Sequence, residues 1–545
     1  MSNPDRLSAL DSTFLHLERN EVHMHVASCI VFEGRPPAYG DLLEHLERRL
    51  HLVPRYRQRL AQVPFEQGRP VWVDDPHFNA RYHLRHTALP RPGSEEQLRN
   101  LTGRVFSQVL DRSKPLWEMW LVEKLEEDRF AILAKTHHAL VDGISGVDLT
   151  TVLLDATPDA PPPAEPDRPW VARPMPSATQ LLADALLERA TVPAEIARGA
   201  RALLRAPRRV ASRVARDVAA IGSLASAGLD PAPPTPLNQP IGPHRRFGWT
   251  AGDLAVLKAT KNRLGGTVND AILTVVTLGL GRFLRARGHS TEGLELRAMV
   301  PVSVRADVER GALGNRVAAM WAPLPVHADD PIECFARIHG SMRDLKGSGQ
   351  AVGAQVLTQL GDFAPPTILV QAARLQSRQR LFNLVITNIP GPQFSLYLLG
   401  RRMQAIYPQV PLASNQGLGI AIMSYDGGVY FGFNADYDAL PDVDALAGEV
   451  AGALEELEEA AGVGRQPPPT ARRATRRTAA AAGKARAPAE RTKNDRPPAV
   501  PPPAVPSVRS DVEPPAPAFS MPRSRPRRPS RRRPSGTPRP ARPGD

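Results

Sequence analysis

The chain has 545 residues, enough for more than one hydrophobic core, and its apolar fraction of 42 % is ordinary for a globular protein. Its formal net charge of +13 belongs to one end: residues 465–545 carry 20 Lys and Arg against 5 Asp and Glu, which leaves −2 for residues 1–464. The composition therefore excludes a basic field over the whole fold that would steer nucleic acid to it, and that argument applies only to the tail.

The first predicted domain, residues 1–155, mixes strand-like and helical patterns. Apolar runs predict strands at Val26–Phe32 and Phe130–Lys135, and apolar residues at helical spacing predict helices near Asp41–Leu50 and Glu95–Val109.

Residues 156–237 are predicted to hold a linker and crossover helices. The stretch up to Pro176 is dense in proline and should be extended, whereas 179–229 combines apolar residues at helical spacing with many arginines. This second stretch either lies on anionic lipid or packs against the two domains as crossover helices. We favour the crossover helices, because basic residues on a helix usually face solvent.

The second predicted domain, residues 238–464, is again mixed α/β. Its expected elements are a helix at Val268–Arg285, strands at Leu294–Val304 and Phe382–Asn388, a hairpin over Gly417–Gly432, and a closing helix at Val443–Ala461. Residues 465–545 are rich in Pro and Arg and almost free of aromatic residues, so they predict a disordered basic tail.

Cysteine usage and hydropathy bear on the compartment. Cys29 and Cys334 lie far apart in apolar surroundings, which predicts buried thiols in a reducing compartment rather than a disulfide framework. The first ten residues lack the apolar stretch of a signal peptide, and no apolar run reaches the ~18–20 residues that cross a bilayer. We expect a cytoplasmic protein that is soluble or lies on a membrane surface.

The sharpest local feature is a pair of histidines, His137 and His138, followed by Asp142 and Gly143. An imidazole with its usual pKa of about 6.5 can take a proton from a hydroxyl group at neutral pH. The carboxylate of Asp142 can fix local geometry, and Gly143 allows a turn directly after it.

Two other interpretations of this pair are open. A shared metal ion is disfavoured, because adjacent residues of a strand point to opposite faces, and we expect no metal. The alternative of two structural histidines with Asp142 as a helix cap is consistent with the heptapeptide taken alone.

The run from His137 to Gly143 resembles the HHxxxDG motif of the coenzyme-A-dependent acyltransferase superfamily, which includes chloramphenicol acetyltransferase and peptide-synthetase condensation domains. Further segments are similar, in the same order, to the bacterial wax ester synthase/diacylglycerol acyltransferase family: Leu7–Leu15, His23–Val26, Pro115–Trp117, Val268–Asp270, Pro301–Arg305, Gly314–Arg316, Thr387–Pro392 and Ser424–Gly427. The resemblance runs from Leu7 to about Gly462 and leaves out the tail.

This resemblance implies an α/β fold of two chloramphenicol-acetyltransferase-like domains with a tunnel between them. It implies that His138 is the general base, with His137 in a supporting role, and that acyl-CoA is a co-substrate with no further cofactor. Asp142 and its neighbour Gly143 would then be structural, with Asp142 paired with Arg305.

Four further residues are candidates. Asn269 either donates to the developing oxyanion, or caps the helix expected to start near Asp270 or otherwise supports the site, and we favour the cap or the supporting role. Asp270 itself is expected to be structural. Asn388 and Trp117 are candidates for contact with substrate, although a rigid turn at Asn388 and a core position for Trp117 explain the pattern equally well or better.

The implied acceptors are diacylglycerol or a long-chain alcohol, and both predict a peripheral position on the inner membrane or on lipid droplets. An amine or polyketide acceptor, as elsewhere in the superfamily, is the competing enzyme class. A non-enzymatic alternative makes the tail a binder of acidic partners. A homodimer is compatible with the sequence.

Overall fold

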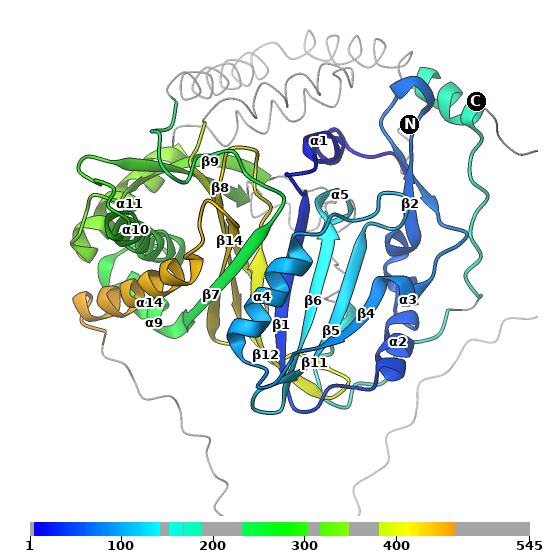
Figure 1. The fold of residues 1–545 in the computed structure, drawn as a ribbon, viewed down its shortest axis with the longest axis horizontal. Coiled ribbons are helices and arrows are strands. Elements are labelled where there is room, and N and C mark those ends of the chain that lie inside the picture. Colours follow the sequence, from blue (N-terminus) through cyan, green and yellow to red (C-terminus); the bar gives the residue numbers. More distant parts are fainter. Residues whose placement is uncertain are drawn as a thin grey trace, which may run out of the picture. The chain divides into compact units, whose positions relative to one another are not determined.

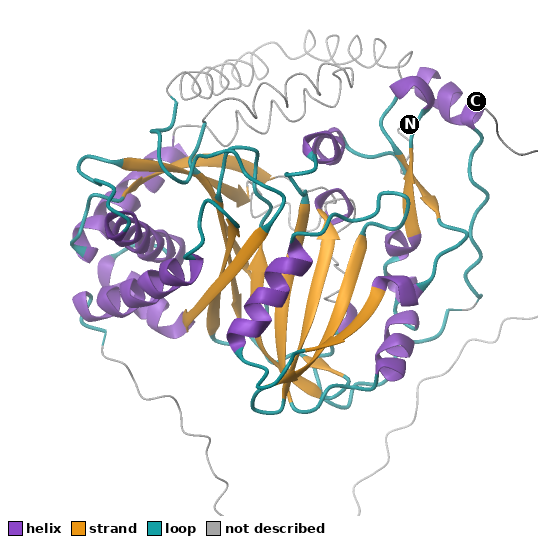
Figure 2. Cartoon of the chain, in the orientation of Figure 1, coloured by secondary structure: helices purple, strands orange, loops and turns teal. Residues whose placement is uncertain are grey.

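The computed structural model describes residues 5–141, 152–166, 168–187, 231–303, 317–347 and 381–463. In this part of the chain the strands form two six-stranded sheets and one two-stranded sheet, with helices packed on their faces (Figures 1 and 2). Most of the arginine-rich stretch 179–229 and the whole predicted tail lie outside the described residues.

The first sheet has the strand order β11-β12-β1-β6-β5-β4. All its pairs are antiparallel except β4 with β5. Its strands are β1 (His25–Glu33), β4 (Leu84–Ala88), β5 (Trp117–Leu125), β6 (Arg129–His137), β11 (Tyr397–Leu398) and β12 (Arg401–Gln409). Side chains alternate along β1, so Ile30 packs into the core that contains α2 (Tyr39–Glu47), and Cys29 into the core under α4 (Glu95–Phe106).

Short elements complete the first half. They are α1 (Ala9–Leu17), α3 (Ala80–His83), α5 (His138–Val141), the 3-10 helices η1 (Leu50–Leu52), η2 (Pro54–Arg57) and η3 (Pro64–Glu66), and the two-stranded sheet of β2 (Gln58–Ala61) and β3 (Val71–Asp74). Figure 1 shows α1 and α5 at the end of the first sheet where β6 finishes.

The second sheet has the order β7-β14-β13-β10-β8-β9. Its strands are β7 (Arg245–Asp253), β8 (Glu295–Ser303), β9 (Val317–Pro325), β10 (Leu384–Pro390), β13 (Leu418–Tyr425) and β14 (Gly428–Asp436). The helices α9 (Leu254–Leu264), α10 (Val268–Ala286), α11 (Pro331–Gly347) and α14 (Val443–Ala460) gather beside this sheet (Figure 1) and share one apolar core with it.

The two halves are interleaved rather than separate. Strand β12 lies within the predicted domain 238–464, yet it pairs along β1 of the first sheet. A division of the sequence into two consecutive domains does not describe this pairing. Two glycines allow the halves to approach closely: a Cβ on Gly432 would lie 1.9 Å from the carbonyl oxygen of Pro408, and one on Gly103 would lie 2.8 Å from that of Arg245.

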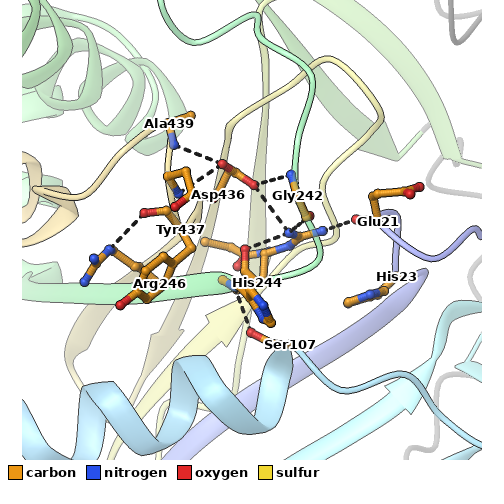
Figure 3. A network of polar contacts seen from close by, with 12 residues as sticks. Glu21, His23, Ser107, Gly242, His244, Arg246, Asp436, Tyr437 and Ala439 are labelled. Carbon is orange, nitrogen blue, oxygen red and sulfur yellow. Dashed lines mark hydrogen bonds and ion pairs between the residues drawn. The ribbon is translucent and has the colours of Figure 1, made fainter.

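A buried arginine, Arg245, joins the halves on the side of α4. Figure 3 labels the residues that it contacts, among them Glu21, Ser107 and Asp436. The guanidinium of Arg245 donates to the carbonyl oxygens of Gly242, His244 and Glu21 and lies 3.7 Å from Asp436 Oδ2. Its backbone N–H donates to Ser107 Oγ at the C-terminal end of α4. Burial lowers the pKa of Arg245 to about 10 against the opposing effect of Asp436, so the side chain remains a cation at neutral pH.

The long periodic elements lie where the sequence predicts them. The helices expected at Val268–Arg285 and Val443–Ala461 are α10 and α14 to within a residue, and the strands at Val26–Phe32 and Phe130–Lys135 are β1 and β6. The predicted hairpin is β13–β14, and its two turn residues, Asp426 and Gly427, both have positive φ.

Two physical expectations about the core and the membrane can be compared with the structure. Cys29 and Cys334 are both fully buried, as their surroundings predict. Among the described residues, no single helix is long and apolar enough to cross a membrane, and only α9 with α10, bent by 100°, meets that length and composition as a pair.

Candidate active site

His138 stands where the central strand β6 passes into the short helix α5. Its backbone N–H donates to the carbonyl oxygen of Met24 at 2.8 Å, which ties it to the residue just before β1. Its partly buried ring lies against the ring of Phe14 on α1, with 4.0 Å between centroids and 30° between planes. The first helix and the first strand therefore hold His138 from two sides.

His137 occupies a different environment, although it is the adjacent residue. It is the last residue of β6, pairs with His25 on β1, and is completely buried. Its backbone N–H donates to the carbonyl oxygen of Leu116 at 2.9 Å, and its Nδ1 accepts from the N–H of Ala139 at 3.1 Å. Because Nδ1 is an acceptor, the neutral ring carries its proton on Nε2.

The proton-bearing Nε2 of His137 faces a buried carboxylate, with 3.6 Å to Glu18 Oε1. Glu18 is the C-cap residue of α1, and its side chain is 7 % exposed. Its Oε1 also accepts from the N–H of Met24 at 3.2 Å, and its Oε2 accepts from Nε of Arg112 at 2.7 Å. Burial raises the pKa of Glu18, but the contacts with His137 and Arg112 outweigh it and hold the pKa at about 2.

A second buried charge lies two residues earlier on β6. The ammonium group of Lys135 contacts Glu118 Oε1 at 2.5 Å and donates to the carbonyl oxygens of Val105 and Gln108. His25 Nε2 donates to the carbonyl oxygen of Phe106 at 2.9 Å. These donors satisfy carbonyl groups at the C-terminal end of α4, which a helix leaves without partners, and they fix α4 on the sheet that carries the histidines.

Trp117 belongs to the core of the first half. It is 2 % exposed, its Nε1 donates to the carbonyl oxygen of Tyr56 at 2.8 Å, and its ring stacks on that of His83 at 4.5 Å. Of the two alternatives for this residue, the position favours the core over contact with substrate.

Asn269 is not the cap of its helix, so that interpretation is wrong. Helix α10 begins at Val268 and is capped by Thr267, whose Oγ1 accepts from the N–H of Asp270 while Oδ2 of Asp270 accepts from the N–H of Thr267. The same Oδ2 of Asp270 lies 2.9 Å from Nδ1 of His339. Asn269, partly buried at the second helical position, keeps its site-supporting alternative.

Asn388 lies on β10 opposite Ile422 of β13, just before the turn that follows Pro390. That turn is bound to the β13–β14 turn: the N–H of Asp426 donates to the carbonyl oxygen of Pro392, and the N–H of Gly391 donates to Ser424 Oγ. The segments Thr387–Pro392 and Ser424–Gly427, both part of the family resemblance, are therefore neighbours in space.

The remaining predicted site residues, Asp142, Gly143 and Arg305, lie outside the described residues, and the pairing of Asp142 with Arg305 stays a prediction. Within the described part, no group of three or more potential metal ligands is found. A small hollow between α4, β7 and β12, whose walls include Trp249 and Tyr407, contains none of the predicted site residues.

The sequence analysis missed Glu18 and Arg112. One signal for Glu18 is available in retrospect: a carboxylate at a helix C-terminus is disfavoured by the helix dipole, so its presence there indicates a partner outside the helix. For Arg112, 94 residues away in the sequence, no local pattern indicates the pairing.

The fold is similar to that of solved two-domain α/β enzymes. The first condensation domain of the CDA synthetase has a similar fold, with a TM-score of 0.50 and 14 % identity, covering 84 % of this chain and 95 % of that one. This likeness concerns the fold alone, and it agrees with the expected two-domain α/β architecture.

Closer similarities identify the family. Residues 7–272 match the wax ester synthase/diacylglycerol acyltransferase catalytic domain, and residues 313–458 match the C-terminal domain of the same family. The solved wax ester synthase/diacylglycerol acyltransferase from Marinobacter aquaeolei VT8 is 28 % identical with a TM-score of 0.58, covering 84 % of this chain and 100 % of that one.

Two relatives agree with this match. A Mycobacterium tuberculosis (strain ATCC 25618 / H37Rv) protein provisionally named diacylglycerol O-acyltransferase is 35 % identical over 472 residues, 84 % of this chain and 90 % of the relative. One from Mycobacterium bovis, similarly named, is 31 % identical over 462 residues, 83 % of this chain and 96 % of the relative. The chain belongs to the wax ester synthase/diacylglycerol acyltransferase family and is an acyltransferase.

Proposed function

We propose that this enzyme transfers a long-chain acyl group from acyl-CoA to diacylglycerol, to a long-chain alcohol, or to both, with His138 as general base. The observation that carries the proposal is the contrast between the two histidines. His137 is completely buried with both ring nitrogens facing protein groups, whereas His138, at the end of the strand, is only partly buried. Of the two, only His138 retains surface for a substrate.

In the proposed reaction His138 takes the proton of the acceptor hydroxyl as its oxygen attacks the thioester carbonyl of acyl-CoA. The tetrahedral intermediate collapses, the carbon–sulfur bond breaks, and the imidazolium returns the proton to the departing CoA sulfur. The products are the ester and free CoA. No covalent acyl-enzyme and no further cofactor are required.

Other predicted residues take supporting roles in this proposal. Asn269 and Asn388 are candidates for contact with substrate in a tunnel between the halves, and Asp142 with Arg305 would hold the loop after the histidines. The two Mycobacterium relatives are provisionally named diacylglycerol O-acyltransferases, which supports diacylglycerol as one acceptor.

The deciding experiment measures ester formation by purified protein from labelled palmitoyl-CoA with diolein, hexadecanol or an amine as acceptor. General-base catalysis typically contributes ~10²–10⁴ in rate, about 3–5 kcal/mol of barrier. We therefore expect His138→Ala to lose that factor in kcat with an unchanged melting temperature, and His137→Ala to lose less. Equal losses in both variants, with the fold intact, would contradict the assignment of roles.

The proposal extends to the cellular setting. Apolar substrates favour a peripheral position on the inner membrane or on lipid droplets, and the basic tail is suited to acidic partners. In the same ester assay, a chain that ends at residue 464 should keep its turnover if the tail only localises the enzyme. Light scattering of the purified chain would decide whether it forms the homodimer that the sequence allows.

A further inference from the structure

Three segments that are distant in the sequence meet at the carboxylate of Glu18. It closes α1, it accepts a hydrogen bond from Met24 just before β1, and Arg112 from the loop between α4 and β5 binds its second oxygen. His137 at the end of β6 faces the first oxygen. The carboxylate therefore contacts both Met24 and His137. These two residues fix the backbone of His138, Met24 by accepting its N–H and His137 by preceding it in the chain.

We propose that Glu18, clamped by Arg112, is a positioning residue that fixes the imidazole of His138 for catalysis; this inference rests on the role proposed above for His138. The contacts of Glu18 described above are with Met24, Arg112 and His137. It acts through its neighbours on both sides: His137 precedes the ring in the chain, and the carbonyl oxygen of Met24 accepts the N–H of His138.

A third route runs through α1 itself. Arg112 also donates to the carbonyl oxygen of Leu15 at 2.9 Å, so one guanidinium holds both the last turn of α1 and its C-cap carboxylate. Phe14, one residue earlier, lies against the ring of His138. A shift of the C-terminal end of α1 would therefore move the ring's apolar support together with its backbone anchor.

The charge of Glu18 matters for this task. Hydrogen bonds to an ionised carboxylate are roughly twice as strong as those between neutral groups, and the carboxylate accepts from several donors at once. With a pKa of about 2, Glu18 stays ionised at every pH at which an acyltransferase would work. It therefore keeps its charge, and its capacity to accept these hydrogen bonds, at neutral pH.

The test compares Glu18→Gln, Arg112→Lys, Arg112→Met and the double variant Glu18→Gln/Arg112→Met with the wild type. Glu44→Gln, which breaks the exposed ion pair with Arg48, is the matched control. The assay uses palmitoyl-CoA and diolein, and reports kcat and the KM for palmitoyl-CoA separately, beside the melting temperature of each variant.

We expect Glu18→Gln to lower kcat at least tenfold while KM stays within twofold, because a small misplacement of a reacting group slows the chemical step more than binding. Arg112→Met should follow in the same direction, Arg112→Lys should lose less, and the double variant should lose no more than Glu18→Gln. If Glu18→Gln does not fold, the Arg112 series alone decides. A kcat within twofold of the wild type in folded variants would overturn the inference.

A second readout does not depend on turnover. Carbethoxylation of His138 by diethyl pyrocarbonate, followed by peptide mass spectrometry, should change at least threefold in rate in Glu18→Gln, while the exposed His289 reacts as before. An unchanged rate at His138 would also overturn the inference. If the wild type forms no ester but His138 reactivity changes in the variant, the proposed function fails and the positioning role stands.

Discussion

At the scale of single residues, Trp117 shows how a side chain in a family motif can serve the site without touching substrate. Its indole is enclosed by core residues, its N–H is bound to the carbonyl oxygen of Tyr56, and its own carbonyl oxygen accepts from Nδ1 of His83. The preceding Leu116 accepts from the N–H of His137. The segment Pro115–Trp117 therefore fixes the end of β6 from the neighbouring strand.

This position predicts the effect of Trp117→Phe. The variant removes the hydrogen bond that Nε1 donates to the buried carbonyl oxygen of Tyr56 and leaves unfilled volume in the core, which together should lower the free energy of unfolding by about 1–3 kcal/mol. The KM for palmitoyl-CoA should remain within twofold of the wild type. Urea unfolding measures the stability, and steady-state kinetics measure the KM. A tenfold higher KM with unchanged stability would mean that Trp117 contacts the substrate.

What the sequence reveals about the site depends on how local each contact is. The histidine pair is visible because its residues are adjacent, and the order of the motifs led to the family. Glu18 escaped because the 118 residues between it and His137 carry no sign that the end of a helix and the end of a strand will meet. A contact of this kind depends on the register of β1 against β6, which the chain alone does not display.

At the scale of elements, the start of α10 distinguishes the two roles considered for Asn269, helix capping and support of the site. The capping residue is Thr267, so Thr267→Ala should lower the free energy of unfolding by about 1 kcal/mol, within the usual range for lost caps. Asn269→Ala, at the second helical position, should change it by less than about 0.5 kcal/mol.

Chemical denaturation of both variants, with ester formation measured beside it, distinguishes the roles. Loss of turnover in a fully stable Asn269→Ala protein would support a contact near the substrate. A destabilisation by Asn269→Ala as large as that by Thr267→Ala would mean that Asn269 supports the helix instead.

Some elements could be predicted from local sequence patterns, whereas the partner of β12 could not. Helix α10 was predictable because apolar residues, interrupted mainly by Thr and Gly, fill most positions between Ala271 and Leu284, and β13–β14 because an Asp-Gly turn separates two apolar strands. Strand β12 shows no local sign of its partner. It follows β11 in the chain, yet it pairs along β1 across more than 370 residues, and only the packing of the two halves fixes that choice.

At the scale of the whole molecule, burial of histidines in the first half predicts how stability depends on pH. Burial lowers the pKa of His23, His25 and His45, and it lowers that of His83 to about 4. Below pH 6.5 the unfolded chain therefore binds protons that the folded chain does not. The free energy of unfolding therefore falls as the pH falls from about 6.5 toward 4.

For His83 alone the depressed pKa amounts to about 2 kcal/mol of lost stability at pH 5 relative to pH 7.5. In His83→Asn the amide can still donate to the carbonyl oxygen of Trp117, but it does not titrate. The difference in unfolding free energy between pH 7.5 and 5 should therefore be about 2 kcal/mol smaller in this variant, and urea titrations at the two pH values measure it. His289→Asn, at an exposed position, is the matched control and should keep the wild-type pH dependence. If His83→Asn also kept the wild-type pH dependence, the pKa of His83 would have to be the same in the folded and the unfolded chain. The buried ring would then take up its proton without unfolding of the first half.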